Sequence, residues 1–246
     1  MKNIILSPQI YFDTINKENN KLPRNFRDLN LYNLKAIASA QFSENELIFI
    51  KKKFFNKKIT IVDLRKENHF FINGIPVSIF NENIDLIEIQ NIDLFYQNQL
   101  TEIKKHSKIS IKLENGDYKE ILIKKLLSEE ELVKSHGFGY KRFPIKDYNF
   151  PNKDIFDDIV EFLLNLKSED LIYVHCAGGK GRSTIFLSIY DIVINSKQTS
   201  LAEIFLRQHK IGGANLYNIK EDNEWEESEK KKLKILVQLY SAMSLQ

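Results

Sequence analysis

The chain has 246 residues, with 36 lysines and arginines against 33 aspartates and glutamates, a formal net charge of +3 and a single cysteine. This length suits one large domain or two small ones, and 43% hydrophobic residues supply a sizeable core. One cysteine excludes an internal disulfide and a cysteine-rich zinc framework. Nine glycines and five prolines exclude collagen-like and Pro/Gly-rich disordered chains. The small net charge does not by itself indicate nucleic-acid binding.

The N-terminus does not resemble an export signal. Lys2 is followed by only three apolar residues before Ser7-Pro8, well short of the ~7–15 that a signal requires. No apolar run elsewhere approaches the ~20 residues of a membrane span, so we expect no stable membrane insertion. Three interpretations stay open: the protein is cytoplasmic, it is exported without a conventional N-terminal signal, or a signal was removed from this chain.

The first part of the chain predicts an irregular lead-in followed by a helix and a strand. Residues 1–35 are polar and are expected to cover the surface. A capping box at 43–46 starts a helix whose apolar residues continue at helical spacing through Phe54. Residues 59–64 are mostly apolar and rich in β-branched side chains, which predicts a short buried strand.

A different pattern follows between residues 75 and 125. Short apolar pieces are broken by Asn, Asp and Gln, and Asn115-Gly116 separates two alternating segments, which is a strong hairpin signal. We therefore expect a small antiparallel β insertion over 75–125, within a larger domain made of 1–74 and 126–246.

Residues 126–246 alternate between helical and strand patterns, which is typical of an α/β domain. The predicted elements are a short helix after a capping box at 128–131, a strand over 140–145, a helix over 152–166, a strand buried on both faces over 171–174, a central apolar helix over 183–194 and a final amphipathic helix through Tyr240.

The segment Val174–Ser183, with the sequence VHCAGGKGRS, carries the clearest chemical signal. A buried strand ends, a glycine-rich turn follows and a helix begins. Three glycines let the turn curl so that its N–H groups point inward, and the helix N-terminus adds further donors and partial positive charge. This arrangement predicts a cradle for a tetrahedral oxyanion.

Two side chains of this segment suit phosphoryl transfer. Arg182 can contact two phosphate oxygens at once. Cys176 lies at the bottom of the cradle, where the positive field favours the nucleophilic thiolate. Three other interpretations are weaker. The cysteine could only pack in the core. A nucleotide-binding loop requires Ser or Thr after the lysine, but Gly181 follows Lys180, and a metal site lacks a further ligand at useful spacing from His175 and Cys176.

The pattern His-Cys-(five residues)-Arg-Ser resembles the signature of cysteine-based phosphatases of the tyrosine phosphatase superfamily. Further segments look like those of bacterial tyrosine-phosphatase-like inositol polyphosphate phosphatases, or cysteine phytases: Leu22–Arg27, Ser39–Ser43, Val62–His69, Asn73–Ser78, Gly137–Tyr140 and Ile211–Gly213. The resemblance extends from about Leu22 to Tyr240. It implies a tyrosine-phosphatase-like catalytic domain with a central, mostly parallel sheet flanked by helices, and a partial barrel for the β insertion.

The resemblance also implies a role for each matching residue. Cys176 attacks phosphorus and forms a phosphocysteine, Ser183 assists the breakdown of that intermediate, and His175 orients the loop and tunes the thiolate. The phosphoryl group is bound by Arg182 and by the loop residues Ala177, Gly178, Gly179, Lys180 and Gly181. No cofactor and no metal is implied.

Asp147 matches the general acid of the family, in the proline-flanked segment 144–151. Chemistry asks for such an acid independently, because an alkoxide leaving group departs poorly unless it is protonated. Composition alone does not choose among 33 carboxylates, and an ordinary surface aspartate at a turn is the alternative.

Three cations match or flank phosphate contacts of the family. Arg65 matches a substrate contact, and the alternative is a salt bridge to Glu67. Lys146 flanks the acid, and Lys220 precedes Trp225. For both lysines the alternative is a solvated surface position. A pocket rimmed by such cations suits a substrate with several phosphates. Two departures bear on the preferred substrate: Tyr148 stands where the family commonly has His, and Ala177 stands where a larger or charged residue is frequent.

The leading hypothesis is therefore a metal-independent phosphatase of myo-inositol polyphosphates, including the hexakisphosphate, whose partner is a small molecule and not a nucleic acid. The alternatives are a phosphoinositide phosphatase, for which the Gly-Lys-Gly-Arg sequence speaks, a protein tyrosine or dual-specificity phosphatase, a catalytically dead phosphate-binding module, and an interaction protein delivered to another cell. The oligomeric state does not follow from the sequence.

Overall fold

The structure is a computed structural model that describes residues 9–15, 21–80, 92–113, 115–167, 169–217 and 226–245. The chain divides into two compact units, each assembled from several segments. Unit 1 comprises Met1–Leu22, Phe42–Lys53 and Glu67–Gly137, and unit 2 comprises Pro23–Gln41, Phe54–Lys66 and Phe138–Gln246.

Unit 2 is built on a five-stranded sheet. In spatial order its strands are β10 (Gly139–Ile145), β4 (Lys58–Arg65), β11 (Asp170–His175), β3 (Ala36–Ser39) and β2 (Arg27–Asp28). The first four run parallel and β2 pairs antiparallel with β3. The predicted strands over 59–64, 140–145 and 171–174 are confirmed, and the sheet is mostly parallel, as expected.

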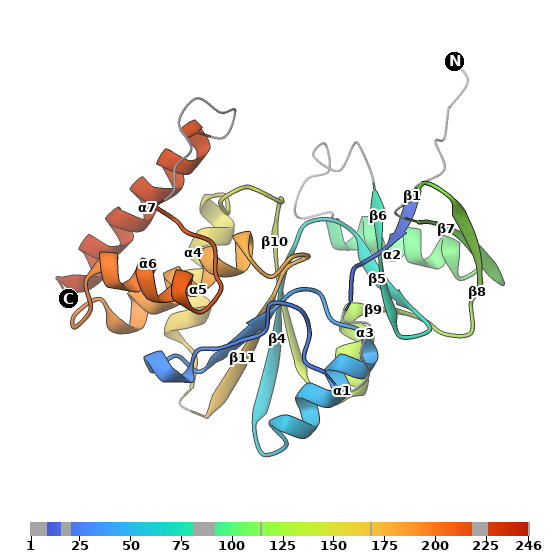
Figure 1. The fold of residues 1–246 in the computed structure, drawn as a ribbon, viewed down its shortest axis with the longest axis horizontal. Helices are drawn as coiled ribbons and strands as arrows, with labels where there is room; N and C mark the ends of the chain where they lie inside the picture. Colours follow the sequence, from blue (N-terminus) through green and yellow to red (C-terminus); the bar gives the residue numbers. More distant parts are fainter. Residues whose placement is uncertain are drawn as a thin grey trace. The chain divides into compact units, whose positions relative to one another are not determined.

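Helices α4 (Lys153–Leu164), α5 (Gly181–Asn195), α6 (Leu201–Lys210) and α7 (Glu226–Ser244) lie on one side of this sheet (Figure 1). A 3-10 turn, η1 (Asn30–Tyr32), precedes β3. Helix α5 is buried from Arg182 to Ile192, which confirms its predicted central position. Ile155, Phe186, Phe205 and Leu236, one from each of the four helices, pack into one apolar core with the sheet. Unit 2 therefore holds β11 and α5 rigidly at both ends of the segment that connects them.

Unit 1 contains an open six-stranded sheet. In spatial order its strands are β8 (Tyr118–Leu122), β7 (Lys108–Lys112), β1 (Gln9–Phe12), β6 (Ile75–Phe80), β5 (His69–Ile72) and β9 (Leu126–Ser128). All pairs are antiparallel except β1 with β7. Strands β8 and β9 form its edges, so the described strands do not close into a barrel.

The segment 75–125, predicted as a β insertion, supplies β6, the hairpin β7–β8 and a helix, α2 (Ile92–Ile103). The helix was not predicted, although Ile92, Tyr96, Leu100 and Ile103 are spaced at three and four residues and are buried. Strands β1, β5 and β9 lie outside 75–125 and join the same sheet, and β1 corrects the expectation of an irregular lead-in. The boundaries of the domains stay a prediction.

Two further helices of unit 1 begin as the sequence predicted. Helix α3 (Glu129–Ser135) has a complete capping box, in which Ser128 and Glu131 bond to each other's backbone N–H groups. At the start of α1 (Glu44–Lys53), Glu46 accepts a hydrogen bond from the backbone N–H of Ser43 at 2.6 Å.

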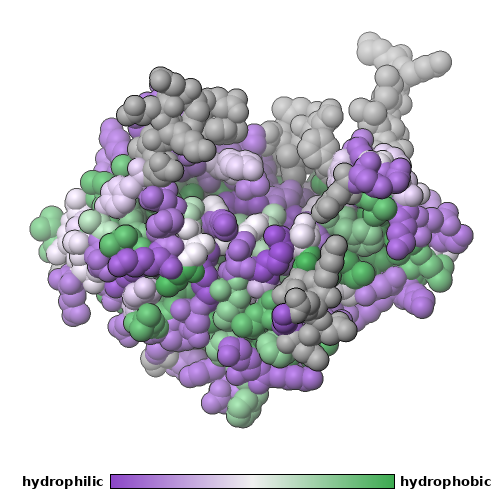
Figure 2. Space-filling model, in the orientation of Figure 1, coloured by the Kyte–Doolittle hydropathy of each residue, from purple (hydrophilic) through white to green (hydrophobic). Residues whose placement is uncertain are grey.

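Hydrophilic residues cover much of the face visible in Figure 2, with apolar residues between them. Among the described residues, none of the helices has the length and apolar character needed to cross a bilayer.

Candidate active site

The segment Cys176–Arg182, here called the anion loop, joins the end of β11 to the first turn of α5. Strand β11 lies between β3 and β4, so the anion loop emerges at the carboxyl edge of three parallel strands. Ligands of open α/β sheets commonly bind at this edge. The fold therefore presents the Cys176 segment where a ligand can meet a helix N-terminus.

The carbonyl groups of the anion loop are held by three segments of unit 2 that are distant in sequence. The Gln41 N–H donates to the carbonyl of Ala177 at 3.1 Å, Asn25 Nδ2 to that of Gly178 at 2.8 Å, and Arg27 Nη1 to that of Gly179 at 2.7 Å. Within the described part of the chain, the N–H groups of residues 177–180 donate to no other residue. With the carbonyls committed elsewhere, these N–H groups remain available to an anion, and the binding of one stays a prediction.

Gly179 is the glycine that this geometry requires most. Its φ is +67°, and a Cβ on it would lie 2.3 Å from the backbone N of Ala40 and from the carbonyl carbon of Ser39. A side chain on Gly178 or Gly181 would meet open space. The anion loop therefore packs directly on the end of β3 through Gly179, and any larger residue there would displace it.

Cys176 lies at the base of the anion loop, with 3% of its surface exposed. Its Sγ accepts a hydrogen bond from Ser183 Oγ at 3.3 Å. Arg182 is buried, and its Nη1 donates to the carbonyl of Ile145 at 3.0 Å. The nucleophile, the hydroxyl and the arginine predicted from the sequence are therefore together at one place.

Asp147 reaches the same place from residues 146–152, the acid loop, which connects β10 to α4. Its Oδ1 lies 3.2 Å from Arg182 Nε, and its side chain is 53% exposed. This carboxylate is therefore not an isolated surface group at a turn, because it pairs with the arginine of the anion loop. Its role as general acid stays a prediction.

Arg27 is a site residue that the sequence analysis did not single out. Only 4% of it is exposed, and its Nη1 also lies 3.4 Å from the carbonyl of Gly212. Burial lowers the pKa of Arg27 to about 10, and the charge of Cys176 opposes this shift. Among the described residues, Nε and Nη2 of Arg27 have no hydrogen-bond partner. The only signal in the sequence was its place in the Leu22–Arg27 segment.

Arg65 contacts the anion loop through one intermediate residue. Its Nη1 donates to Gln41 Oε1 at 2.7 Å, and the backbone N–H of Gln41 holds the Ala177 carbonyl. The predicted direct contact of Arg65 with substrate stays a prediction, but the structure places this buried guanidinium beside the anion loop.

A buried carboxylate, Asp63, organises the ends of the neighbouring strands. It accepts hydrogen bonds from the N–H of Arg65 at 2.8 Å and from the hydroxyl of Tyr140 at 3.0 Å, and it lies 3.1 Å from Arg142 Nε. His175 Nε2 lies 4.0 Å from Asp63 Oδ1, and both side chains are completely buried. His175 is thus held in the sheet directly before the anion loop, and its role in orienting that loop stays a prediction. Sequence reasoning did not identify Asp63, Tyr140 or Arg142.

The predicted peripheral lysines differ in where they lie. Lys146 and Lys180 are exposed, next to Asp147 and within the anion loop respectively. Lys220 lies outside the described residues, and its contribution stays a prediction.

Comparison with known proteins gives a matching family model and similar relatives. A family model described as PTP-like phytase, with inositol hexakisphosphate in its description, matches residues 92–194, which include Asp147, Cys176 and Arg182. The effector protein hopD2 of Pseudomonas syringae pv. tomato is 26% identical over 215 residues, which is 82% of this chain and 46% of that protein.

Two solved structures share the fold. The PTP-like myo-inositol phosphatase of Mitsuokella multacida, in complex with myo-inositol-(1,3,4,5)-tetrakisphosphate, is similar with a TM-score of 0.85 and 27% identity, over 96% of this chain and 45% of that one. A PTP-like phytase of Bdellovibrio bacteriovorus has a TM-score of 0.82 and 23% identity, over 97% and 89%. The chain thus spans about half the length of hopD2 and of the Mitsuokella protein.

Proposed function

We propose that this chain, which matches a PTP-like phytase family model over residues 92–194, hydrolyses phosphomonoesters of myo-inositol polyphosphates, including the hexakisphosphate, by cysteine catalysis without a metal ion. The observation that carries this proposal is the hydrogen bond from Ser183 to Cys176 Sγ at the base of the anion loop, with Arg182 and Asp147 paired beside it. These two contacts bring the proposed nucleophile, phosphate clamp and acid together around the anion loop.

In the first step the phosphoryl group occupies the anion loop, bound by the N–H groups of residues 177–180 and by Arg182. The Cys176 thiolate attacks phosphorus, an S–P bond forms, and the P–O bond to the leaving group breaks. Asp147 gives its proton to the departing oxygen, which leaves as an alcohol. The loop donors stabilise the charge on the transferring group because they are fixed in place before the reaction.

In the second step water attacks the phosphocysteine. Asp147, now a carboxylate, accepts a proton from this water, the S–P bond breaks, and inorganic phosphate and the Cys176 thiolate are released. Ser183 Oγ, 3.3 Å from Sγ, donates to the departing sulfur and so favours the thiolate. The reaction regenerates every group and consumes one water.

The choice of a substrate with several phosphates rests on charge around the anion loop. Arg27 and Arg65 are buried beside it, and Lys146 and Lys180 are exposed next to its reactive groups. The similar Mitsuokella phosphatase binds an inositol tetrakisphosphate. A phosphotyrosine has a single phosphate, and these additional cations would not be needed to bind it.

The test is a phosphate-release panel with inositol hexakisphosphate, phosphoinositides in vesicles and a phosphotyrosine peptide, using the wild type, Cys176→Ser and Asp147→Asn. We expect the fastest release from the inositol polyphosphate, inhibition by vanadate, which mimics a tetrahedral phosphate, and full activity in EDTA. Preferential release from vesicles or from the peptide would reject the substrate class. Loss of activity in EDTA would reject the mechanism, and binding of phosphate by a wild type without activity would indicate a dead binding module.

A further inference from the structure

The acid loop contains a backbone conformation that needs support. Tyr148, directly after Asp147, has a φ of +61°, in the left-handed region that residues other than glycine rarely adopt. Its N–H donates to Asp147 Oδ1 at 3.0 Å, so this conformation also fixes the direction of the carboxylate. A strained backbone persists only where its surroundings hold it.

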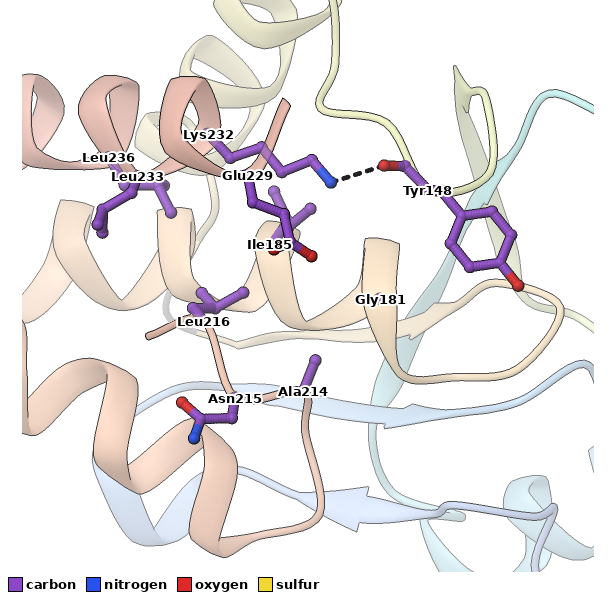
Figure 3. Close-up of a pocket in the computed structure, with 10 residues that line it drawn as sticks. All are labelled: Tyr148, Gly181, Ile185, Ala214, Asn215, Leu216, Glu229, Lys232, Leu233 and Leu236. Atoms are coloured by element: carbon purple, nitrogen blue, oxygen red, sulfur yellow. Dashed lines mark hydrogen bonds between the residues drawn. The ribbon is translucent and has the colours of Figure 1, made fainter. Parts of the chain in front are cut away.

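A lysine from the last helix supplies such a contact. Lys232 Nζ, on α7, donates to the carbonyl of Tyr148 at 2.6 Å. Figure 3 shows the lysine extending from α7 to this carbonyl, while the Tyr148 ring points away from the helix. The contact joins two segments that are 84 residues apart in the sequence.

The lysine is itself held by the core of unit 2. It lines a pocket of about 170 Å³, whose apolar walls include Ile185 of α5 and Leu233 and Leu236 of α7. Burial lowers the pKa of Lys232, and the negative charges of Glu229 and Asp147 oppose this shift. The ammonium group therefore lies within the electrostatic reach of Asp147 as well as in contact with the next residue.

We propose that Lys232 is a positioning residue for the general acid: by holding the carbonyl of Tyr148, it keeps the acid loop in the conformation that directs Asp147 toward the anion loop. This inference rests on the proposed role of Asp147. Helix α7 packs on α5, which begins with Arg182 in its first turn, so one rigid helix pair sets the position of both the acid and the phosphate clamp. A displacement of about 1 Å at a reacting group can reduce a rate substantially.

The test uses the leaving-group dependence of the rate. Phenyl phosphate requires protonation of its leaving oxygen, whereas 2,4-dinitrophenyl phosphate has a leaving group that departs as a stable anion. Lys232→Met should lower kcat on phenyl phosphate about 10-fold and on the dinitrophenyl ester less than about twofold, because only the first depends on Asp147. Lys232→Arg, which keeps a cationic donor, should recover most of the lost rate.

Lys234→Met removes the same charge from an exposed position of α7 and should leave both rates unchanged. Amide hydrogen exchange of the peptide over residues 145–150 gives a readout independent of catalysis, and it should become faster in Lys232→Met but not in Lys234→Met. An equal loss on both substrates, or no loss, together with unchanged exchange, would overturn the proposal.

The design also separates this inference from the proposed function. If Asp147→Asn affects both esters equally, Asp147 is not the acid and the proposed mechanism fails. If the wild type releases phosphate neither from these esters nor from inositol hexakisphosphate, the proposed activity fails, and the exchange measurement alone decides whether Lys232 holds the acid loop.

Discussion

The two units of this protein use buried charge in different ways. In unit 2, Arg27 donates to the Gly179 carbonyl of the anion loop and Arg65 donates to the side-chain carbonyl of Gln41. In unit 1, the buried His69 and Glu129 lie 3.2 Å apart, each with 2% of its side chain exposed. The Glu129 carboxylate of unit 1 thus has an imidazole beside it, whereas the Arg27 guanidinium of unit 2 donates to carbonyl oxygens.

The difference indicates which charges serve structure and which serve binding. A buried charge without a counter-charge is costly, so a fold keeps it only where something repays the cost. Nε and Nη2 of Arg27 have no hydrogen-bond partner among the described residues, and Arg27 lies beside a loop whose N–H groups also lack acceptors there. An incoming phosphate would provide acceptors for the N–H groups of the loop, and the predictions below test this interpretation.

The largest effect is expected when the nucleophile is removed and the cations around it are kept. Cys176→Ser replaces Sγ by a hydroxyl that does not ionise near neutral pH, so phosphate release should fall by about 10⁴-fold or more. Binding of an inositol polyphosphate, measured by isothermal titration calorimetry, should persist because the loop donors are unchanged. Residual turnover within 10-fold of the wild type would contradict the assignment of the nucleophile.

Asp147→Asn should have the next largest effect. The amide keeps the shape of the side chain but has no proton to give to the leaving oxygen, so kcat on inositol hexakisphosphate should fall by about 10²- to 10⁴-fold. The loss should be much smaller on 2,4-dinitrophenyl phosphate. A similar loss on both substrates would indicate that the contact with Arg182, and not proton transfer, is what the variant removes.

Arg27→Met tests the comparison between the units most directly. It removes a donor that holds the Gly179 carbonyl together with a charge close to Cys176, so activity should fall by about 10- to 100-fold. Lys108→Met, which breaks an exposed pair with Glu120 in unit 1, is the matched control and should change activity by less than about twofold. Arg27→Lys and a thermal melt of each variant distinguish lost function from lost folding. Equal effects of the Arg27 and Lys108 variants would remove the distinction between the units.

The reactive centre could be predicted from the sequence because its parts are local. Cys176, Arg182 and Ser183 stand in one short segment, and a strand, a glycine turn and a helix fix their relation. The groups that hold this segment in shape were missed. Asn25, Arg27 and Gln41 reach the loop carbonyls from about 135 to 153 residues away in sequence, and no local pattern marks such a contact.

The fold was predictable to a similar extent. Strand β11 and helix α5 were predicted closely because their apolar runs are continuous. Helix α2 was missed because its polar Asn, Gln and Asp residues resemble the broken pattern around it, and burial of one face decides its structure. Strand β1 was missed because its partners β6 and β7 lie more than 60 residues away.

The smallest effect is expected for a charged group of unit 1, Glu44. Glu44 lies 2.7 Å from Lys125 Nζ and 3.0 Å from His136 Nε2. Burial acts to raise the pKa of Glu44, but the hydrogen bonds from Lys125 and His136 outweigh it and leave this pKa below its usual value. Because the folded-state pKa is depressed, the stabilisation is present above the unfolded-state pKa of about 4.3 and is lost as the pH falls through the folded-state pKa.

Glu44→Gln should therefore lower the free energy of unfolding at pH 7 by less than about 1 kcal/mol, since Lys125 is half exposed and the pair is partly screened. In urea titrations the difference between wild type and variant should shrink as the pH falls below about 4. The rate of phosphate release at pH 7 should not change, because this charge has its counter-charges within unit 1. A loss of activity at unchanged stability would mean that unit 1 also places charge for the reaction, and the division of labour between the units would no longer hold.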